Sequence, residues 1–256
     1  MLSADPNPKL HQVTVPVADI RDEPGGARLR QLVYGETVEQ IGDREGWIAV
    51  RAVRDGYRGV MKPTDLAPAQ EATHRVIALG THLYAAPDIK ARDTEGLSFG
   101  SRLTLDGDSD GFLRTHDGRY VPKVHVTRVG RHFRDPAGVA ELFLGTPYLW
   151  GGNSRLGLDC SGLVQIACHA CGIPCPGDSG DQAREAGTPV GIEVPLARGD
   201  LLFWDGHVAM AVAPDRLIHA NAHHMAVVFE LAEEAVRRIA KQGGGRLIAR
   251  RRLLVD

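Results

Sequence analysis

The chain has 256 residues, which is long enough for several small domains, each with its own core. Its formal net charge is −2 and 24% of its residues are charged. A protein that coats nucleic acid or lies on a membrane needs a concentrated basic face, so this balance argues against both classes. The segment Met1–Pro8 lacks the apolar core of a signal peptide, and we expect a cytoplasmic protein without a transmembrane helix.

The four cysteines all lie between Cys160 and Cys175. Disulfides that join separate domains would need cysteines in each of those domains, so this clustering argues against such a framework and we expect reduced thiols. The run Cys168–Cys171 includes a histidine and, with Cys175, has metal-like spacing. A zinc site normally needs a second ligand pair elsewhere, and this run lies inside an apolar helix. We therefore expect core packing, with neither metal nor cofactor.

The first half of the chain consists of short apolar runs separated by turn residues, which predicts strands. The predicted strands of the first copy are Val13–Val15, Leu29–Tyr34, Glu36–Ile41, Trp47–Val53 and Tyr57–Met61. A second copy follows, in which Leu97–Gly100 echoes Leu32–Gly35 and Gly111-Phe112 echoes Gly46-Trp47. The repeat predicts two small all-β barrels, at residues 12–68 and 73–129.

A different pattern begins near Pro136 and continues to Asp256. Helices are predicted from Pro136 to Leu144, from Cys160 to Cys171, and from a capping box at Ser179 to about Ala186. Strands and one amphipathic helix are predicted beyond them: Asp200–Trp204, His207–Val212, Arg216–Asn221, Met225–Glu230, the helix Leu231–Lys241, and Arg246–Leu253. Helices followed by an antiparallel meander predict an α+β domain.

The stretch from Leu158 to Val164 places a thiol where a loop becomes a helix. Asp159 is a good N-cap residue, which puts Cys160 in the first helical turn. Unpaired N–H groups and the helix dipole favour a thiolate there and lower a pKa that is ordinarily about 8.5. A free cysteine is often only a small core residue. The glycine-rich loop before Cys160 and the histidines after it favour a nucleophile.

A thiol nucleophile needs a base and a group that orients the base. His207 and His219 lie on successive predicted strands and fit these two roles. They share a sheet face only if the connection has an odd length, such as a three-residue loop at 214–216, whereas a two-residue turn predicts opposite faces. His223 and His224 compete for the orienting role. His219 with His223 also has metal-like spacing, but a strand gives poor ligand geometry.

Several ordered motifs resemble the NlpC-type family of cell-wall cysteine peptidases. They are Tyr148–Gly152, Asp159–Val164, Arg198–Trp204, Gly206–Val208 and Ile218–Ala220. The resemblance covers roughly Pro136 to Asp256. The two N-terminal repeats resemble the bacterial SH3-like modules that precede this domain in a branch that recycles wall peptides in the cytoplasm.

The resemblance implies a papain-like core and hydrolysis of the bond between γ-D-glutamate and a diamino acid in peptidoglycan peptides. It makes Cys160 the nucleophile, His207 the base and His219 the orienting residue. Tyr148 then lines the oxyanion site together with the backbone N–H of Cys160, which agrees with the helix-terminus argument.

The resemblance also implies a pocket for the free amine of an N-terminal L-Ala. Glu36 and Tyr57 of the first module, with Asp159, match the residues that hold this amine. Carboxylates in a closed pocket favour an ammonium group and disfavour a longer glycan-linked peptide. Each residue has an alternative role: Asp159 as an N-cap, Glu36 as a solvated strand residue and Tyr57 as a packing ring.

The stretch Pro176–Ser179 departs from the family pattern. A basic residue is expected before the Asp-Ser pair, and the chain has Gly177 there. This removes one anchor for the D-Glu carboxylate and leaves Ser161 and Ser179 as its expected ligands.

Three functions follow from these patterns. The first is a γ-D-glutamyl-diamino-acid endopeptidase that acts on free peptidoglycan-derived peptides, with no nucleic-acid or membrane partner. The second is a non-catalytic wall-peptide-binding protein, and the third is an amidase or acyltransferase with the same Cys/His framework. The intact set of Cys160, His207 and His219 favours the first.

Overall fold

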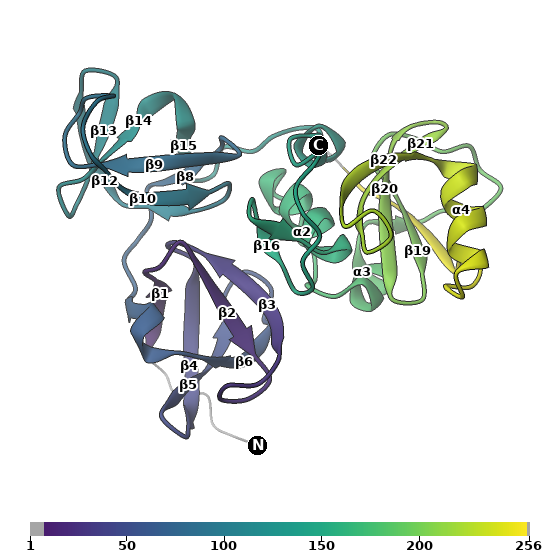
Figure 1. The fold of residues 1–256 in the computed structure, drawn as a ribbon, viewed down its shortest axis with the longest axis horizontal. Coiled ribbons are helices and arrows are strands. Elements are labelled where there is room, and N and C mark those ends of the chain that lie inside the picture. Colours follow the sequence, from purple (N-terminus) through teal and green to yellow (C-terminus); the bar gives the residue numbers. More distant parts are fainter. Residues whose placement is uncertain (1–7, 255–256) are drawn as a thin grey trace. The chain divides into compact units, whose positions relative to one another are not determined.

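The structure is a computed structural model that describes residues 8–254. The chain divides into two compact units, Met1–Arg131 and His132–Asp256 (Figure 1). The prediction about a signal peptide rests on Met1–Pro8, of which Met1–Asn7 lie outside the described residues. Within residues 8–254, no helix has the length and apolar character needed to cross a membrane.

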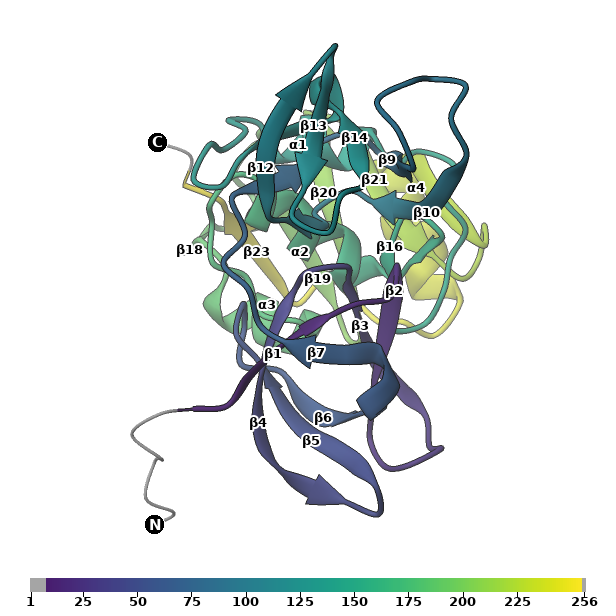
Figure 2. The ribbon, with the colours of Figure 1, turned by 90° about the vertical axis from the view of Figure 1, so that its left-hand side faces the viewer.

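The first unit begins with a seven-stranded antiparallel sheet in the order β3-β2-β6-β5-β4-β1-β7. Its elements are β1 (Leu10–Val13), β2 (Val17–Arg21), β3 (Arg28–Val33), β4 (Thr37–Arg44), β5 (Trp47–Ala52), β6 (Arg58–Met61), the 3₁₀ helix η1 (Pro63–Asp65) and β7 (Leu66–Pro68). The sheet curls around a core that includes Ile20, Leu32, Val50 and Met61 (Figure 2). The sequence prediction missed β2 and β7, since each carries only a few apolar residues.

The first unit continues with a five-stranded sheet, in the order β10-β9-β14-β13-β12, and a three-stranded sheet, in the order β11-β8-β15. The elements are β8 (His74–Val76), β9 (Gly80–Tyr84), β10 (Asp93–Ser98), β11 (Arg102–Leu103), β12 (Leu105–Ser109), β13 (Phe112–Thr115), β14 (Tyr120–Pro122), the 3₁₀ helix η2 (Lys123–His125) and β15 (Val126–Arg128).

The backbone of the two halves of this unit repeats the same turn. Glu45 and Gly46, between β4 and β5, have φ angles of 50° and 79°. Asp110 and Gly111, between β12 and β13, have φ angles of 44° and 84°. Two consecutive residues with positive φ form the tight hairpin turn that matches the twist of antiparallel strands. The glycines recognised as repeated in the sequence therefore meet the same backbone requirement twice.

Tyr34 comes from the first half of this unit but packs in the core of the second half, beside Val76 and Leu83. Its carbonyl accepts from the N–H of Arg102 at 2.8 Å, and its hydroxyl accepts from Arg119 at 3.0 Å. At the next residue, Gly35, an added Cβ would lie 2.0 Å from the Arg102 carbonyl oxygen. The backbones approach so closely here that a side chain has no room.

The second unit is built on a six-stranded sheet in the order β18-β23-β19-β20-β21-β22. Its strands are β18 (Thr188–Pro189), β19 (Asp200–Trp204), β20 (His207–Ala213), β21 (Arg216–Asn221), β22 (Ala226–Leu231) and β23 (Ala249–Arg252). The other elements are α1 (Pro136–Glu141), the short pair β16 (Asn153–Ser154) and β17 (Gly157–Leu158), α2 (Cys160–Ala170), α3 (Ser179–Glu185) and α4 (Ala232–Lys241).

Two helices pack against this sheet and position the side chains described below. Helix α2 packs on β20 and β21 (Figure 1). Helix α4 packs through Ala235 and Ile239 against Ala211 and Leu217. The sequence predicted both helices and all the long strands of this sheet, as an α+β arrangement.

Two helix ends differ from the predictions. Helix α1 ends at Glu141, before the predicted Leu144. The N-cap residue of α3 is Asp178, so Ser179 is its first helical residue instead of its cap. Gln182 does not complete a capping box: it is fully buried, and its amide donates to the carbonyls of Ser161 and Pro176, each at 2.9 Å. This side chain ties α3 to the start of α2.

Candidate active site

Cys160 is the first residue of α2, as predicted, and Asp159 caps the helix. The Asp159 Oδ1 atom accepts from the N–H of Gly162 at 2.6 Å and from the Ser161 hydroxyl at 3.2 Å. Its Oδ2 atom accepts from the N–H of Gly151 at 3.0 Å. One carboxylate therefore holds the glycine-rich loop against the helix end that carries the thiol.

The Cys160 side chain lies at the beginning of β20. Its Sγ atom is 4.0 Å from the carbonyl oxygen of Gly206, the residue before His207, and Cys160 is only 8% exposed. The packing of α2 on β20 brings about this meeting of two segments that are far apart in the sequence. A buried thiol at a helix N-terminus faces unpaired N–H groups and the positive end of the helix dipole.

His207 and His219 are in hydrogen-bond contact. The Nε2 atom of His207 lies 3.0 Å from the Nδ1 atom of His219, and the ring centroids are 5.2 Å apart. His219 is almost fully buried, whereas His207 keeps a half-buried edge at the start of β20. The predicted pairing of the two rings on one sheet face is confirmed.

The connection between these strands corrects one step of the prediction. Strands β20 and β21 are joined by the two-residue turn 214–215, which was expected to place the histidines on opposite faces. The pairing register shifts between Ala211 and Ala213, which leaves Val212 as the extra residue of a β-bulge. A bulge changes the alternation by one residue, so it restores the shared face that the short turn removes.

Glu230 and Arg238 extend this chain of contacts, and the sequence analysis missed both. The Nε2 atom of His219 lies 3.0 Å from Glu230 Oε2. Arg238 binds the same carboxylate with two nitrogens, Nη2 to Oε2 at 2.7 Å and Nε to Oε1 at 2.8 Å. Because His219 pairs with Val228 across β21 and β22, strand alternation places Glu230 on the histidine face. This register is the signal that could have identified it.

The neighbouring histidines do not occupy the orienting position. His224 Nδ1 lies 3.0 Å from Asn221 Oδ1, and His223 Nδ1 lies 3.0 Å from Gln242 Nε2. His219 is therefore the residue beside His207. Within residues 8–254, no three His, Cys, Asp or Glu side chains gather closely enough to hold a metal ion.

The protonation states in this chain follow from burial and charge. The pKa of His207 is lowered to about 3, chiefly by burial; the neighbouring His219 and Arg238 act in the same direction, and Glu230 opposes them. Burial alone raises the pKa of Glu230, but hydrogen bonds from Arg238 and His219 override it and hold that pKa well below its usual range. At neutral pH His207 is an uncharged imidazole that can accept a proton, and Glu230 is an anion.

Tyr148 borders the same thiol. Its backbone N–H donates to the Met225 carbonyl at 2.9 Å, and it bridges to Leu158 just before the helix. Burial, more than the interactions with Cys160 and Asp159, raises the pKa of Tyr148 to about 12. The phenol therefore keeps its proton at neutral pH and is a hydrogen-bond donor near Cys160.

The predicted substrate-binding residues of the second unit differ in their surroundings. Ser161 is buried, with its hydroxyl on Asp159, whereas Ser179 is half-buried at the start of α3. No basic side chain takes the place of Gly177 in the sequence 176–179.

Glu36 and Tyr57 belong to the first unit. Glu36 is buried, and its carboxylate accepts from Arg54 at 2.7 and 2.9 Å and from the N–H of Val33 at 2.8 Å. The Tyr57 ring packs on the core of the first sheet, with the guanidinium of Arg30 over it at 5.6 Å. The expectation of a solvated Glu36 is wrong, because a long-range arginine covers it. The roles of both residues toward an amine stay predictions.

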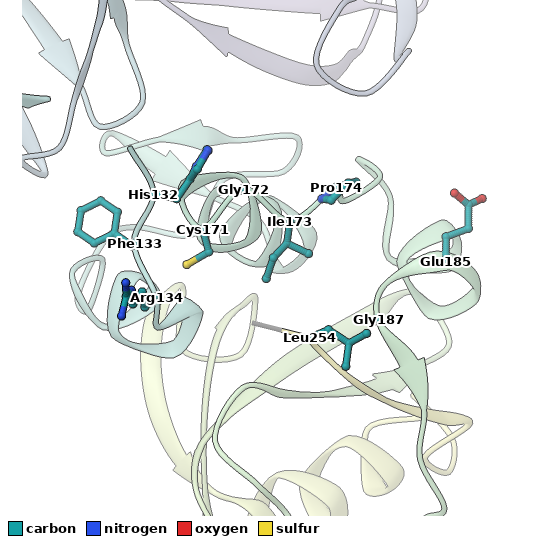
Figure 3. Close-up of a pocket in the computed structure, with 10 residues that line it drawn as sticks. All are labelled: His132, Phe133, Arg134, Cys171, Gly172, Ile173, Pro174, Glu185, Gly187 and Leu254. Carbon is teal, nitrogen blue, oxygen red and sulfur yellow. The ribbon is translucent and has the colours of Figure 1, made fainter. Parts of the chain in front are cut away.

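The other cysteines are reduced and pack in the interior of the unit or at its margin. The hydrogen bond to Cys175, followed by burial, raises the pKa of Cys168 well above its ordinary value. His169 Nε2 lies 3.1 Å from the Cys175 carbonyl oxygen. Cys171 borders a cavity of about 590 Å³ at the far end of α2 from Cys160 (Figure 3). Its other lining residues are His132, Phe133, Arg134, Gly172, Ile173, Pro174, Glu185, Gly187 and Leu254, none of them a predicted site residue.

A thiol at a helix start, close to a strand that carries one of two hydrogen-bonded histidines, fits the residue types that cysteine peptidases use, and this chain is an enzyme of that class. Residues 145–240 match the NlpC/P60 family, and residues 20–66 match the bacterial dipeptidyl-peptidase SH3 domain. The chain therefore contains an NlpC/P60 domain and, ahead of it, a bacterial SH3 domain.

Two curated relatives and one solved structure show how far the similarity extends. The γ-D-glutamyl-L-lysine dipeptidyl-peptidases of Bacillus cereus and Bacillus subtilis are each 29% identical to this chain, in alignments that cover 74% of it. The alignments cover 66% and 71% of those two proteins, so the chain spans about two thirds of their length. A crystal structure of an NlpC/P60 family protein from Bacillus cereus has the same fold, with a TM-score of 0.78 and 22% identity over 96% of this chain and 99% of that chain.

Proposed function

We propose that the protein hydrolyses the bond between γ-D-glutamate and a diamino acid in small peptidoglycan-derived peptides. The observation that carries the proposal is the contact of 3.0 Å between His207 and His219, with the Sγ atom of Cys160 4.0 Å from the carbonyl oxygen of Gly206, the residue before His207. The names of the Bacillus relatives supply the substrate class. The proposal includes two SH3-like modules, a papain-like catalytic core and a cytoplasmic role in peptide recycling.

In the proposed mechanism the neutral His207 takes the proton of the Cys160 thiol, and the thiolate attacks the γ-carbonyl carbon of D-glutamate. The tetrahedral oxyanion accepts from the Tyr148 phenol and from the backbone N–H of Cys160. His207 then gives its proton to the leaving amine, the C–N bond breaks, and a thioester remains. His207 next takes a proton from water, the resulting hydroxide attacks the thioester, and the thiol regains a proton as the dipeptide leaves.

We propose different protein partners for the two charged groups of the substrate, the free amine of L-Ala and the α-carboxylate of D-Glu. Asp159, Glu36 and Tyr57 bind the free amine of L-Ala, and Ser161 and Ser179 bind the α-carboxylate of D-Glu. The carboxylate of Glu36 already binds Arg54, so an ammonium group must compete with that arginine. Asp159 directly precedes the thiol residue and accepts from the backbone N–H groups of Gly151 and Gly162, which makes it the stronger of the two carboxylate candidates.

The test is incubation of the full chain with L-Ala-γ-D-Glu-diaminopimelate and with the matching lysine peptide, followed by mass spectrometry. Wild type is expected to release L-Ala-D-Glu, Cys160→Ala to release none, and the control Cys171→Ala to match wild type. Equal release by wild type and Cys160→Ala, or none by wild type, overturns the proposal. Binding without release would favour a wall-peptide-binding protein.

The amine pocket has a separate test. N-acetylation of the L-Ala removes its positive charge and is expected to abolish turnover. Unchanged rates with the acetylated peptide would exclude Glu36, Tyr57 and Asp159 from their proposed roles. Release of a product joined to an acceptor other than water would favour acyl transfer.

A further inference from the structure

We propose that Glu230 is a positioning residue that fixes the protons of both histidines, so that the ring nitrogen of His207 left for the thiol is unprotonated. Arg238 supports this arrangement of protons by keeping His219 uncharged. The inference deepens the proposed peptidase function and rests on it. Arg238 contacts Glu230 and Glu230 contacts His219, so both residues act through the histidines.

Glu230 determines which atom donates and which accepts in the hydrogen bonds of the two histidines. An ionised carboxylate can only accept, so the Nε2 atom of His219, 3.0 Å away, must carry a hydrogen. In a neutral imidazole the other nitrogen is then an acceptor. The Nδ1 atom of His219 therefore accepts from Nε2–H of His207 across the 3.0 Å contact. The Nδ1 atom of His207 is then unprotonated, and its lone pair can accept the proton of the Cys160 thiol.

This order of protons requires a neutral His219. A protonated His219 would donate from Nδ1 to His207, and the hydrogen of His207 would move to the nitrogen that the thiol needs. The carboxylate of Glu230 alone would favour that protonated state. Arg238 prevents it, because its bidentate contact already balances the carboxylate charge. The His219 side chain has no exposed surface, which further disfavours a second positive charge there.

The surrounding groups support this assignment. The charged and titratable groups near Glu230 are Arg238 of α4, His219 of β21 and His224 of the connection to β22. The charged or titratable groups that act on His207 are His219, Arg238 and Glu230, and the Sγ atom of Cys160 in α2 lies 4.0 Å from the carbonyl oxygen of the preceding residue, Gly206. Arg238 is held in place because α4 buries Ala235 and Ile239 on the sheet.

The first test replaces Glu230 by glutamine in the full chain. The Gln carbonyl will face Arg238, which turns the amide N–H₂ toward His219 and reverses the order of donors. We expect kcat to fall on the order of 10²- to 10⁴-fold, the range seen when a catalytic histidine is held in the wrong tautomer. Glu234→Gln, an exposed change in the same helix, is the matched control and should leave kcat unchanged.

The second measurement does not depend on activity. In ¹⁵N NMR of histidine-labelled protein, His207 is expected to carry its hydrogen on Nε2 in wild type and on Nδ1 in Glu230→Gln. A tautomer that is the same in both proteins overturns the proposal, even if kcat falls, since Glu230 would then be merely structural. If wild type cleaves no peptide, the tautomer result still decides this inference independently of the proposed function.

The third test addresses Arg238. Arg238→Met leaves the Glu230 charge unbalanced, so His219 should hold a proton at neutral pH. We expect kcat/KM to be at least about tenfold lower at pH 7 and to recover toward wild type as the pH rises and His219 loses that proton. A loss that is equal at all pH values overturns the role of Arg238.

Discussion

The carboxylate of Asp159 provides a direct test of how the thiol is held in place. Replacing it with alanine removes the N-cap acceptor of α2 and leaves the N–H of Gly151 without the acceptor that it uses. Loss of an N-cap typically costs about 1 kcal/mol, and a buried donor left unpaired costs about 1–3 kcal/mol. The second unit should therefore lose about 2–4 kcal/mol of its free energy of unfolding.

Asparagine at this position separates the two contributions. Asp159→Asn keeps one oxygen for the cap but presents its amide N–H₂ to the N–H of Gly151. The cap contribution is kept and the loop contribution is lost, so the cost should be smaller, about 1–3 kcal/mol. The structure thus predicts a fixed order of stability: wild type, then asparagine, then alanine.

Urea unfolding followed by tryptophan fluorescence can measure this order in the full chain. Trp47 is in the first unit, and Trp150 and Trp204 are in the second, so a Trp47→Phe background restricts the signal to the second unit. The control is Asp215→Ala, an exposed aspartate in the β20–β21 turn, which should stay within about 0.5 kcal/mol of the parent. An alanine variant as stable as this control, or an asparagine variant weaker than alanine, would refute the reasoning.

Three further predictions concern the histidines and the tyrosine. Deletion of Val212 removes only the extra residue of the bulge, so Ala211 should still pair with Leu217 and His219 should stay on the sheet face of His207; hydrolysis should persist while circular dichroism reports a folded sheet. Loss of hydrolysis in that folded variant would contradict the register argument. Tyr148→Phe should lower kcat about 10- to 1,000-fold with little change in KM, and a change in KM alone would contradict an oxyanion role. Unfolded His207 binds a proton below about pH 6.5, whereas the native side chain stays neutral down to about 3. Stability should therefore fall as the pH drops through this window, and His207→Gln should flatten that slope in acid-unfolding curves.

The sequence predicted those parts of the molecule that short-range physics determines. Strands β19 and β21 and the start of α2 lie where they were expected, because apolar runs and an N-cap aspartate act over a few residues. The pairing of His207 with His219 was also predicted, although for the wrong reason. The Val212 bulge depends on how two strands pack, and single-strand alternation contains no sign of it.

The residues that were missed or misjudged depend on long-range contacts. Glu230 became visible only once the β21–β22 register was known, and Arg238 only once α4 was packed on the sheet. Glu36 reads as a solvated strand residue, yet Arg54 from the loop before β6 closes over it. In each case a partner distant in the sequence determines the environment of the side chain.

The position of Tyr34 has a consequence for folding. A side chain encoded in the first repeat completes the interior of the second, so the second repeat does not contain all of its own core. The cooperative folding unit is therefore the pair, and the sequence boundary between the repeats is not a boundary of stability. Hydrogen exchange should show the two halves opening together, and a fragment cut between them would leave an empty slot in one half and an exposed tyrosine in the other.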